Sequence, residues 1–192
     1  MRMAEAMRAD ARRNYERLLA VARDVFAEHG TDASLRDVAR RAGVGIGTLY
    51  RRFPTRESLL EAIVRDGFDN LRTSAQELLG AQLPRDALLT WLRQLAAGSA
   101  TFRGLPESVM AALHDEDSEL HASCQAMRTA GAQLLDRAQR SGAVRADVTA
   151  DELLALAAGV AWVSKQSPGG AALVDRLLTL ANDGLATERG RT

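Results

Sequence analysis

The stretch S-L-R-D-V-A-R-R-A-G-V-G-I-G-T-L-Y-R-R-F, residues 34–53, decides the fold of this chain. Its first half places small or apolar side chains at i, i+3, i+4 and i+7, the spacing of one helix face. These side chains are Leu35, Val38, Ala39 and Ala42. Ser34 is predicted to cap this helix with its hydroxyl, and Gly43 to end it in the left-handed conformation.

A second short helix follows the glycine, and it is predicted to turn Leu49 and Phe53 inward. Ala39 is small enough for the two helices to cross closely, and Val44 is placed to fill the space between them. This combination predicts a helix-turn-helix. The alternative is a plain helical hairpin inside a helical protein, which the flanking residues disfavour.

With its flanks, the stretch closely resembles the N-terminal DNA-binding domain of the TetR family of bacterial transcriptional regulators. The match runs over residues 18–60, and its most specific pieces are Phe26-Ala27-Glu28-His29-Gly30, Val38-Ala39, Ala42-Gly43-Val44, Gly47-Thr48-Leu49-Tyr50 and Phe53. The resemblance implies an all-α protein. A three-helix helix-turn-helix domain is expected over residues 1–54, and a helical bundle for effector binding and dimerisation over residues 55–192.

The net charge of the 192-residue chain is zero, but it is unevenly distributed. Residues 1–53 carry 11 arginines against 7 acidic residues, and residues 54–192 carry 14 basic against 18 acidic residues. A basic N-terminal part on an acidic remainder is expected when one end of a protein meets phosphates. The single cysteine, Cys124, and the lack of a long apolar run predict a cytoplasmic protein without a membrane span.

Alanine and leucine dominate the chain and strand-type alternation is absent, so the remaining elements are predicted to be helices. Residues 1–10 are predicted to be a frayed tail, and Gly30 to end the first helix. Thr55 is predicted to cap the helix after Pro54, and Thr149 with Glu152 to form a capping box. Further helices are predicted over 86–102, 107–113, from the acidic break at 114–117 to about Arg140, from Thr149 to Val163, and from Leu173 to Leu185.

In the family, the helix after the turn enters the major groove. By position, the resemblance implies DNA contacts from Ser34, Arg36, Ile46, Gly47, Thr48, Tyr50, Arg51, Arg52 and Arg56. Arg36 and Arg51 are expected to read bases, because a guanidinium offers two donors to guanine O6 and N7. Thr48 and Tyr50 are expected to bind phosphates, which fix the register on the duplex.

The chain departs from the commonest family pattern at two positions. Gly45 stands where a capping serine is usual, and Ile46 where a polar residue is usual. Two roles are open for Ile46: apolar contact with a thymine methyl, or packing beside Leu49. Arg52 is either a backbone contact or solvated, and Arg56 occupies the position where the family places a lysine against the DNA backbone.

An effector pocket in the second domain is also implied by the resemblance. The candidate lining residues are Trp91, Leu95, Phe102, Met110, Leu113, His114, His121, Cys124, Met127 and Trp162. The alternative for each apolar one is ordinary core. Tryptophan and methionine fill irregular space, so an apolar or aromatic effector is expected. His121, Cys124 and Asp117 follow no strict metal motif, so neither a metal nor a cofactor is predicted.

The helix around residues 153–164 is apolar nearly all round, so it must be covered on every side. The last helix has a similar surplus, and the two are predicted to meet their two-fold copies in a four-helix bundle. The predicted dimer contacts are Leu156, Gly159, Val160, Val163, Leu173, Leu177, Leu178 and Leu180.

Three functions compete. The first is a homodimeric repressor that binds a palindromic operator in double-stranded DNA and is released by a small molecule. The second is a DNA-binding regulator that has no effector or acts as an activator. The third is a helical-bundle enzyme, which the sequence disfavours, because no histidine has a glutamate three residues before it and no nucleophile or phosphate-loop motif is present.

Overall fold

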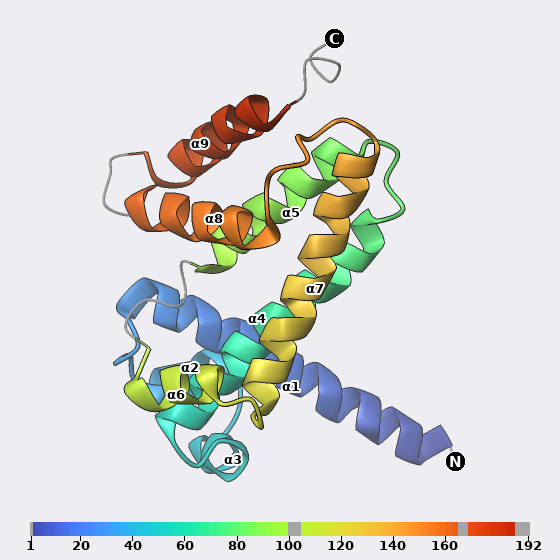
Figure 1. Ribbon diagram of the computed structural model, residues 1–192. Coiled ribbons are helices and arrows are strands. Elements are labelled where there is room, and N and C mark those ends of the chain that lie inside the picture. Colours follow the sequence, from blue (N-terminus) through green and yellow to red (C-terminus); the bar gives the residue numbers. More distant parts are fainter. Residues whose placement is uncertain (1, 100–104, 165–168, 187–192) are drawn as a thin grey trace. The chain divides into compact units, whose positions relative to one another are not determined.

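The computed structural model describes residues 2–99, 105–164 and 169–186. Within these ranges the helices are α1 (Arg2–His29), α2 (Leu35–Ala42), α3 (Ile46–Arg52), α4 (Arg56–Leu78), α5 (Pro84–Ser99), α6 (Glu107–His114), α7 (Glu119–Arg140), α8 (Ala150–Ser164) and α9 (Gly170–Leu185) (Figure 1). The only strand-type pairing in the described chain is an isolated bridge between Val144 and Ala186. The predicted all-α class is confirmed.

The helices pack into two compact units. The first unit consists of Met1–Asp66 and Arg103–Leu120, and the second of Gly67–Phe102 and His121–Thr192. The packing therefore divides inside α4, whereas the predicted domain boundary lies before this helix, at residue 54. That boundary concerns function, and it stays a prediction.

In the first unit, α1 packs on α2 and α2 on α3. Sequence periodicity places Leu19, Val25 and Phe26 on one apolar stripe of α1, and all three are buried. The helix begins at Arg2, so the predicted frayed tail over residues 1–10 is wrong for the backbone. Alanine, methionine and arginine are strong helix formers, and extending an existing helix costs far less than starting one.

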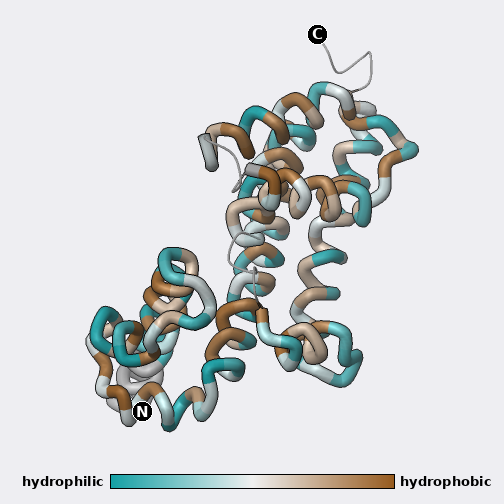
Figure 2. The backbone as a smooth tube through the Cα atoms, turned by 90° about the vertical axis from the view of Figure 1, so that its left-hand side faces the viewer, coloured by the Kyte–Doolittle hydropathy of each residue, from teal (hydrophilic) through white to brown (hydrophobic). Residues whose placement is uncertain are grey.

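In the second unit, α5 lies against α8 and α9, and α8 against α9. The hydropathy-coloured tube in Figure 2 alternates hydrophobic and hydrophilic positions along most helices, as amphipathic packing requires. Trp91 of α5 is 2% exposed, and its indole N–H donates to the Leu71 carbonyl of α4 at 2.9 Å. Gly131 of α7 makes room for this ring, because a Cβ there would lie 2.3 Å from Trp91 Cη2.

Two of the three predicted N-terminal helix caps are confirmed. The Glu152 N–H donates to Thr149 Oγ1 at 3.3 Å, and the Thr149 N–H donates to Glu152 Oε2 at 2.8 Å. The Ser58 N–H donates to Thr55 Oγ1 at 3.1 Å. The hydroxyl cap predicted for Ser34 is wrong: its side chain makes no cap bond, and its carbonyl instead accepts the Val38 N–H at 3.1 Å.

Candidate nucleic-acid interface

The turn between α2 and α3 depends on a left-handed glycine, as predicted. Gly43 has φ 68° and ψ 30°, a conformation that costs glycine little. The N–H groups of Gly43 and Val44 donate to the carbonyls of Arg40 and Ala39 at 3.2 and 3.0 Å. These bonds close α2 and direct the chain into α3, with Gly45 as its N-cap. The predicted helix-turn-helix is therefore formed.

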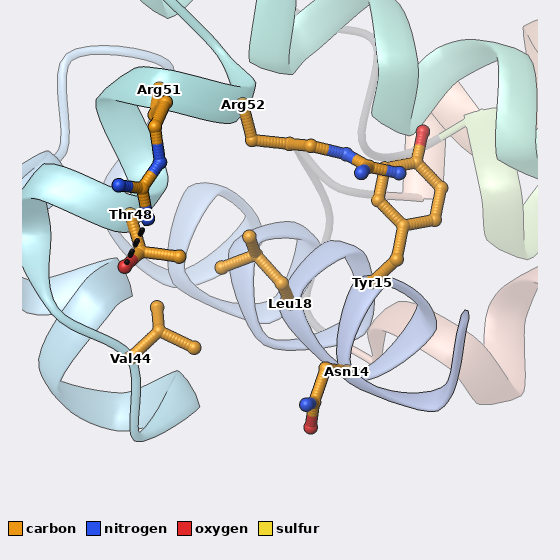
Figure 3. Close-up of a pocket in the computed structure, with 7 residues that line it drawn as sticks. All are labelled: Asn14, Tyr15, Leu18, Val44, Thr48, Arg51 and Arg52. Atoms are coloured by element: carbon orange, nitrogen blue, oxygen red, sulfur yellow. Dashed lines mark hydrogen bonds between the residues drawn. The ribbon is translucent and has the colours of Figure 1, made fainter. Parts of the chain in front are cut away.

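Few contacts hold α3. Leu49 is the one buried residue among its seven, and its N-cap has no side chain to bond. The next residue, Phe53, is 5% exposed, and its ring stacks on that of Tyr15 at a centroid distance of 5.9 Å. The Arg52 guanidinium lies 4.5 Å from the centroid of the same Tyr15 ring (Figure 3). Tyr15 of α1 thus contacts the last residue of α3 and the residue that follows it.

Several arginines of the first unit have acidic partners. Arg23 pairs with Asp66 at 2.5 Å, Arg40 with Asp37 at 2.8 Å, and Arg41 with Glu28 at 2.7 Å. The hydrogen bond and charge of Arg41 lower the pKa of Glu28, and those of Arg40 lower the pKa of Asp37. These acids therefore stay ionised at neutral pH and neutralise their neighbours.

Three arginines of the motif lack such a partner. Arg36, Arg51 and Arg52 are exposed, and within the described residues none of them forms an ion pair. The closest polar contact of Arg51 is internal, from Nη2 to Thr48 Oγ1 at 3.3 Å. The motif therefore presents positive charge that the described chain does not compensate.

The other predicted DNA contacts differ in their accessibility. Ile46 is 36% exposed and Tyr50 47% exposed, so the packing of Ile46 into the core is not observed. Ser34, Gly47 and Thr48 are also exposed.

Arg56 is half-buried, and its guanidinium is occupied within the first unit. Its Nη1 donates to the carbonyls of Thr31 and Ala33 at 2.7 and 2.5 Å. Both acceptors lie in the link between α1 and α2, so this side chain ties that link to the start of α4.

A cavity of about 410 Å³ lies beside α3 and was not predicted. It is lined by Asn14, Tyr15 and Leu18 of α1, Val44 of the turn, and Thr48, Arg51 and Arg52 of α3 (Figure 3). Sequence periodicity assigns Tyr15 to the apolar stripe of α1, and the structure leaves it half-buried at the edge of this cavity. In the sequence, the only indication of this cavity edge is that a tyrosine, which carries a polar hydroxyl, stands at the end of an apolar stripe.

The residues predicted to line an effector pocket fall in both units. Trp91, Leu95 and Met127 are buried in the second unit, where Trp162 is 58% exposed. His121 and Cys124 of the same unit are half-buried, and burial raises the pKa of the Cys124 thiol, which keeps it neutral.

The first unit contains three of the predicted pocket residues. Met110 is 38% exposed, His114 is exposed, and Leu113 is half-buried. The His114 Nδ1 lies 2.7 Å from the Met110 carbonyl one turn earlier on α6. Phe102 lies outside the described residues. The effector pocket stays a prediction.

The predicted dimer residues also divide by burial. Leu178 and Val160 are 1% and 9% exposed, so they are covered within one chain. Val163 and Leu180 are 45% and 48% exposed, and a Cβ at the exposed Gly159 would meet nothing within 4 Å. The remaining members, Leu156, Leu173 and Leu177, are half-buried.

Comparison with known proteins identifies the family. Residues 18–63 match the family described as bacterial regulatory proteins of the tetR family, and residues 83–187 match the SbtR-like transcriptional regulator C-terminal domain. The chain belongs to the TetR family. It is a transcriptional regulator, not an enzyme, and its helix-turn-helix is the DNA-binding element of that family.

Relatives of this TetR-family regulator share nearly its full length. It is 29% identical to the HTH-type transcriptional repressor KstR2 of Rhodococcus jostii RHA1, over 88% of this chain and 90% of the relative. It resembles the TetR regulator SCO0520 of Streptomyces coelicolor with 37% identity and a TM-score of 0.76, over 90% and 98% of the two chains. A TetR regulator of Mycobacterium vanbaalenii gives 34% identity and a TM-score of 0.69, over 94% and 99%. In the described residues, no helix combines the length and apolar character needed to cross a membrane.

Proposed function

We propose that this TetR-family protein is a cytoplasmic repressor that binds a palindromic operator as a homodimer and is released by a small, apolar molecule. The observation that carries the DNA-binding part is the set of unpaired guanidiniums, Arg36, Arg51 and Arg52, on the helix-turn-helix. Repression is supported by the name of the 29%-identical relative, a transcriptional repressor.

Uncompensated arginines favour a polyanion, because they release counterions from DNA on binding and break no internal ion pair. Arg36 and Arg51 are proposed to read guanines, and Thr48 and Tyr50 to bind phosphates. The exposure of Ile46 supports an apolar contact with a thymine methyl. Arg56 already binds two carbonyls, which supports a role in positioning the motif in addition to the proposed backbone contact.

The homodimer is supported by apolar area on α8 and α9 that the described chain leaves uncovered. Trp162, Val163 and Leu180 are exposed large hydrophobic residues, and Gly159 is open on the same helix as Trp162. Packing α8 and α9 against their two-fold copies would bury this area in a four-helix bundle. The symmetry would then place two reading helices on one face of a palindrome.

A small apolar effector is supported by the apolar character of the second unit. Trp91, Leu95 and Met127 are buried there, and apolar side chains of this kind suit a ligand without formal charge. We place the protein in the cytoplasm because its proposed target is bacterial DNA.

The test begins with selection of genomic fragments by the full-length protein, followed by sedimentation of the complex and fluorescence anisotropy on the selected site. We expect a palindrome bound by two chains. Gly159→Arg should give monomers that lose specific binding, whereas Gln82→Arg, at an exposed position between α4 and α5, should leave the dimer intact. Selection of no common sequence, or sedimentation of the wild type as a monomer at micromolar concentration, would contradict the proposal.

A further inference from the structure

The cavity beside α3 has a divided lining. Leu18 and Val44 supply apolar side chains, and Tyr15 supplies an aromatic ring. Arg51 and Arg52 supply two guanidiniums with no ion pair inside the described chain. Asn14 and Thr48 add an amide and a hydroxyl. Figure 3 shows the Arg51 guanidinium beside Thr48 and the Arg52 guanidinium over the Tyr15 ring, with Leu18 between the two in this view.

This composition corresponds to a small-molecule site. Such sites measure about 300–1,000 Å³ and combine mostly apolar walls with a few polar groups that set orientation, and the present cavity measures about 410 Å³. A guanidinium at the edge of apolar walls selects a ligand with a flat apolar body and one anionic end. A guanidinium binds a carboxylate through two parallel hydrogen bonds.

We infer that this cavity binds an aromatic monocarboxylate, with the ring over Leu18 and Val44 beside Tyr15, and the carboxylate on the Arg51 guanidinium. A DNA phosphodiester is the competing occupant. A phosphodiester is strongly hydrated in water and has no apolar group to place against the apolar walls. The lining therefore favours the aromatic anion.

The location of the site gives it a regulatory consequence. The carboxylate would occupy Arg51, which is proposed to read a base. A ligand bound here competes directly with DNA for the same charges. This consequence rests on the proposed DNA-binding function, whereas the binding of the ligand does not.

The experiment uses 1-naphthoate as the probe and uncharged 1-naphthalenemethanol as its matched control, titrated into the full-length protein by calorimetry. The expected dissociation constant of naphthoate is at or below about 1 mM, which is ordinary for a ligand of this size. The neutral alcohol should bind at least about tenfold more weakly, because it lacks the charge-assisted hydrogen bonds.

Two variants locate the site. Asn14→Trp changes an exposed residue at the edge of the cavity and should abolish naphthoate binding by filling the space, whereas Ala20→Trp, exposed on α1 outside the cavity, should not. Arg51→Gln should weaken binding about tenfold. Absence of binding, or binding that Asn14→Trp leaves unchanged, would overturn the inference.

Competition is then measured with a labelled random-sequence duplex at low salt, which needs no knowledge of the operator. Naphthoate should weaken duplex binding by the wild type and not by Asn14→Trp. The opposite outcome is that naphthoate does not bind while Asn14→Trp weakens duplex binding and lowers its salt dependence. That outcome would show that the cavity binds a DNA phosphate and that the inference is wrong. A wild type that binds naphthoate but no DNA contradicts the proposed function and leaves the ligand site intact.

Discussion

Helices α3 and α5 are built in opposite ways. Among the 16 residues of α5, seven are buried: Ala87, Leu88, Leu89, Trp91, Leu92, Leu95 and Ala96. Among the seven residues of α3, only Leu49 is buried. Helix α5 contributes to a core, whereas α3 is a short surface helix held by one side chain and by its neighbours at one end.

A similar contrast separates several arginines of the second unit from three arginines of the helix-turn-helix. In the second unit, Arg85 donates to the Asn182 carbonyl at 3.0 Å and Arg128 pairs with Asp151 at 2.5 Å. Arg137 donates to the Leu78 and Ala81 carbonyls at the end of α4. On the helix-turn-helix, Arg36, Arg51 and Arg52 have no carboxylate partner among the described residues. The charge of these three arginines is available to a partner, whereas the charges of Arg85, Arg128 and Arg137 stabilise the fold.

The largest effect is expected at Trp91. Trp91→Ala removes a buried ring and its hydrogen bond to Leu71, and it should cost about 3–5 kcal/mol of unfolding free energy. Trp91→Phe keeps most of the volume and should cost about 1–3 kcal/mol. Denaturant unfolding followed by circular dichroism measures both. A stable Trp91→Ala protein with an altered effector response would instead assign Trp91 to a pocket.

The contact between α5 and α7 gives the next prediction. Gly131→Ala would place a Cβ 2.3 Å from Trp91 Cη2, so overpacking should destabilise the protein by about 1–3 kcal/mol despite the better helix propensity of alanine. The matched variant, Gly98→Ala on α5, meets nothing within 4 Å and should stabilise by about 0.5–1 kcal/mol. Equal melting temperatures for the two variants would show that the second unit is not tightly packed here.

Local sequence signals predicted the local structure well. The period of apolar residues, the glycine at the turn and the capping box each depend on neighbours within a few positions, and the structure contains all three. The basic face of the motif was also predicted, because residues three and four apart on a helix share a face. The features that the sequence did not predict depend on contacts between residues that are far apart in the chain.

Arg56, Tyr15 and the cavity are examples of such contacts. Nothing in the sequence states that Arg56 binds carbonyls 25 and 23 residues earlier, or that Tyr15 lies beside Arg52. The cavity is the space left where side chains of α1 and α3 fail to meet, and no periodicity encodes it. The predicted effector residues share apolar character, and apolar character alone does not distinguish a pocket from a core.

The unpaired arginines give the third prediction. Arg51→Ala or Arg36→Ala should weaken operator binding by about 1–3 kcal/mol and leave the melting temperature unchanged, because neither side chain has an acidic partner within the described residues. Arg40→Ala is the matched control, since Arg40 is exposed on α2 but paired with Asp37. Anisotropy on the selected operator measures all three. Unchanged affinity in both Arg51→Ala and Arg36→Ala would show that the recognition surface lies elsewhere.

A smaller effect on stability is expected at Arg56, which belongs to the stabilising class of arginines although it lies beside the motif. Arg56→Ala should destabilise the first unit by about 1–2 kcal/mol through loss of its bonds to Thr31 and Ala33. Arg56→Lys keeps the charge but not the forked donor. If the residue acts mainly through DNA phosphates, lysine should restore affinity and salt dependence. If it acts mainly by positioning, lysine should restore neither stability nor affinity.

The smallest effect is expected from the ion pair between Glu28 of α1 and Arg41 of α2. Arg41 lowers the pKa of Glu28 below 4.5 through its hydrogen bond and its charge. A carboxylate with a lowered pKa stabilises the fold above its unfolded pKa, and this stabilisation disappears as the pH falls through its folded value. The wild type should therefore melt slightly above Glu28→Gln at about pH 6, and the difference should shrink as the pH falls below 4.5. Because both partners are exposed, about 1 M salt should also reduce the difference in melting temperature. Arg41→Gln should remove the same pH-dependent stabilisation. The double variant should be little less stable than either single variant. A difference that persists in acid would show that Glu28 stabilises α1 by packing, and the contrast between paired and unpaired arginines would then not rest on charge.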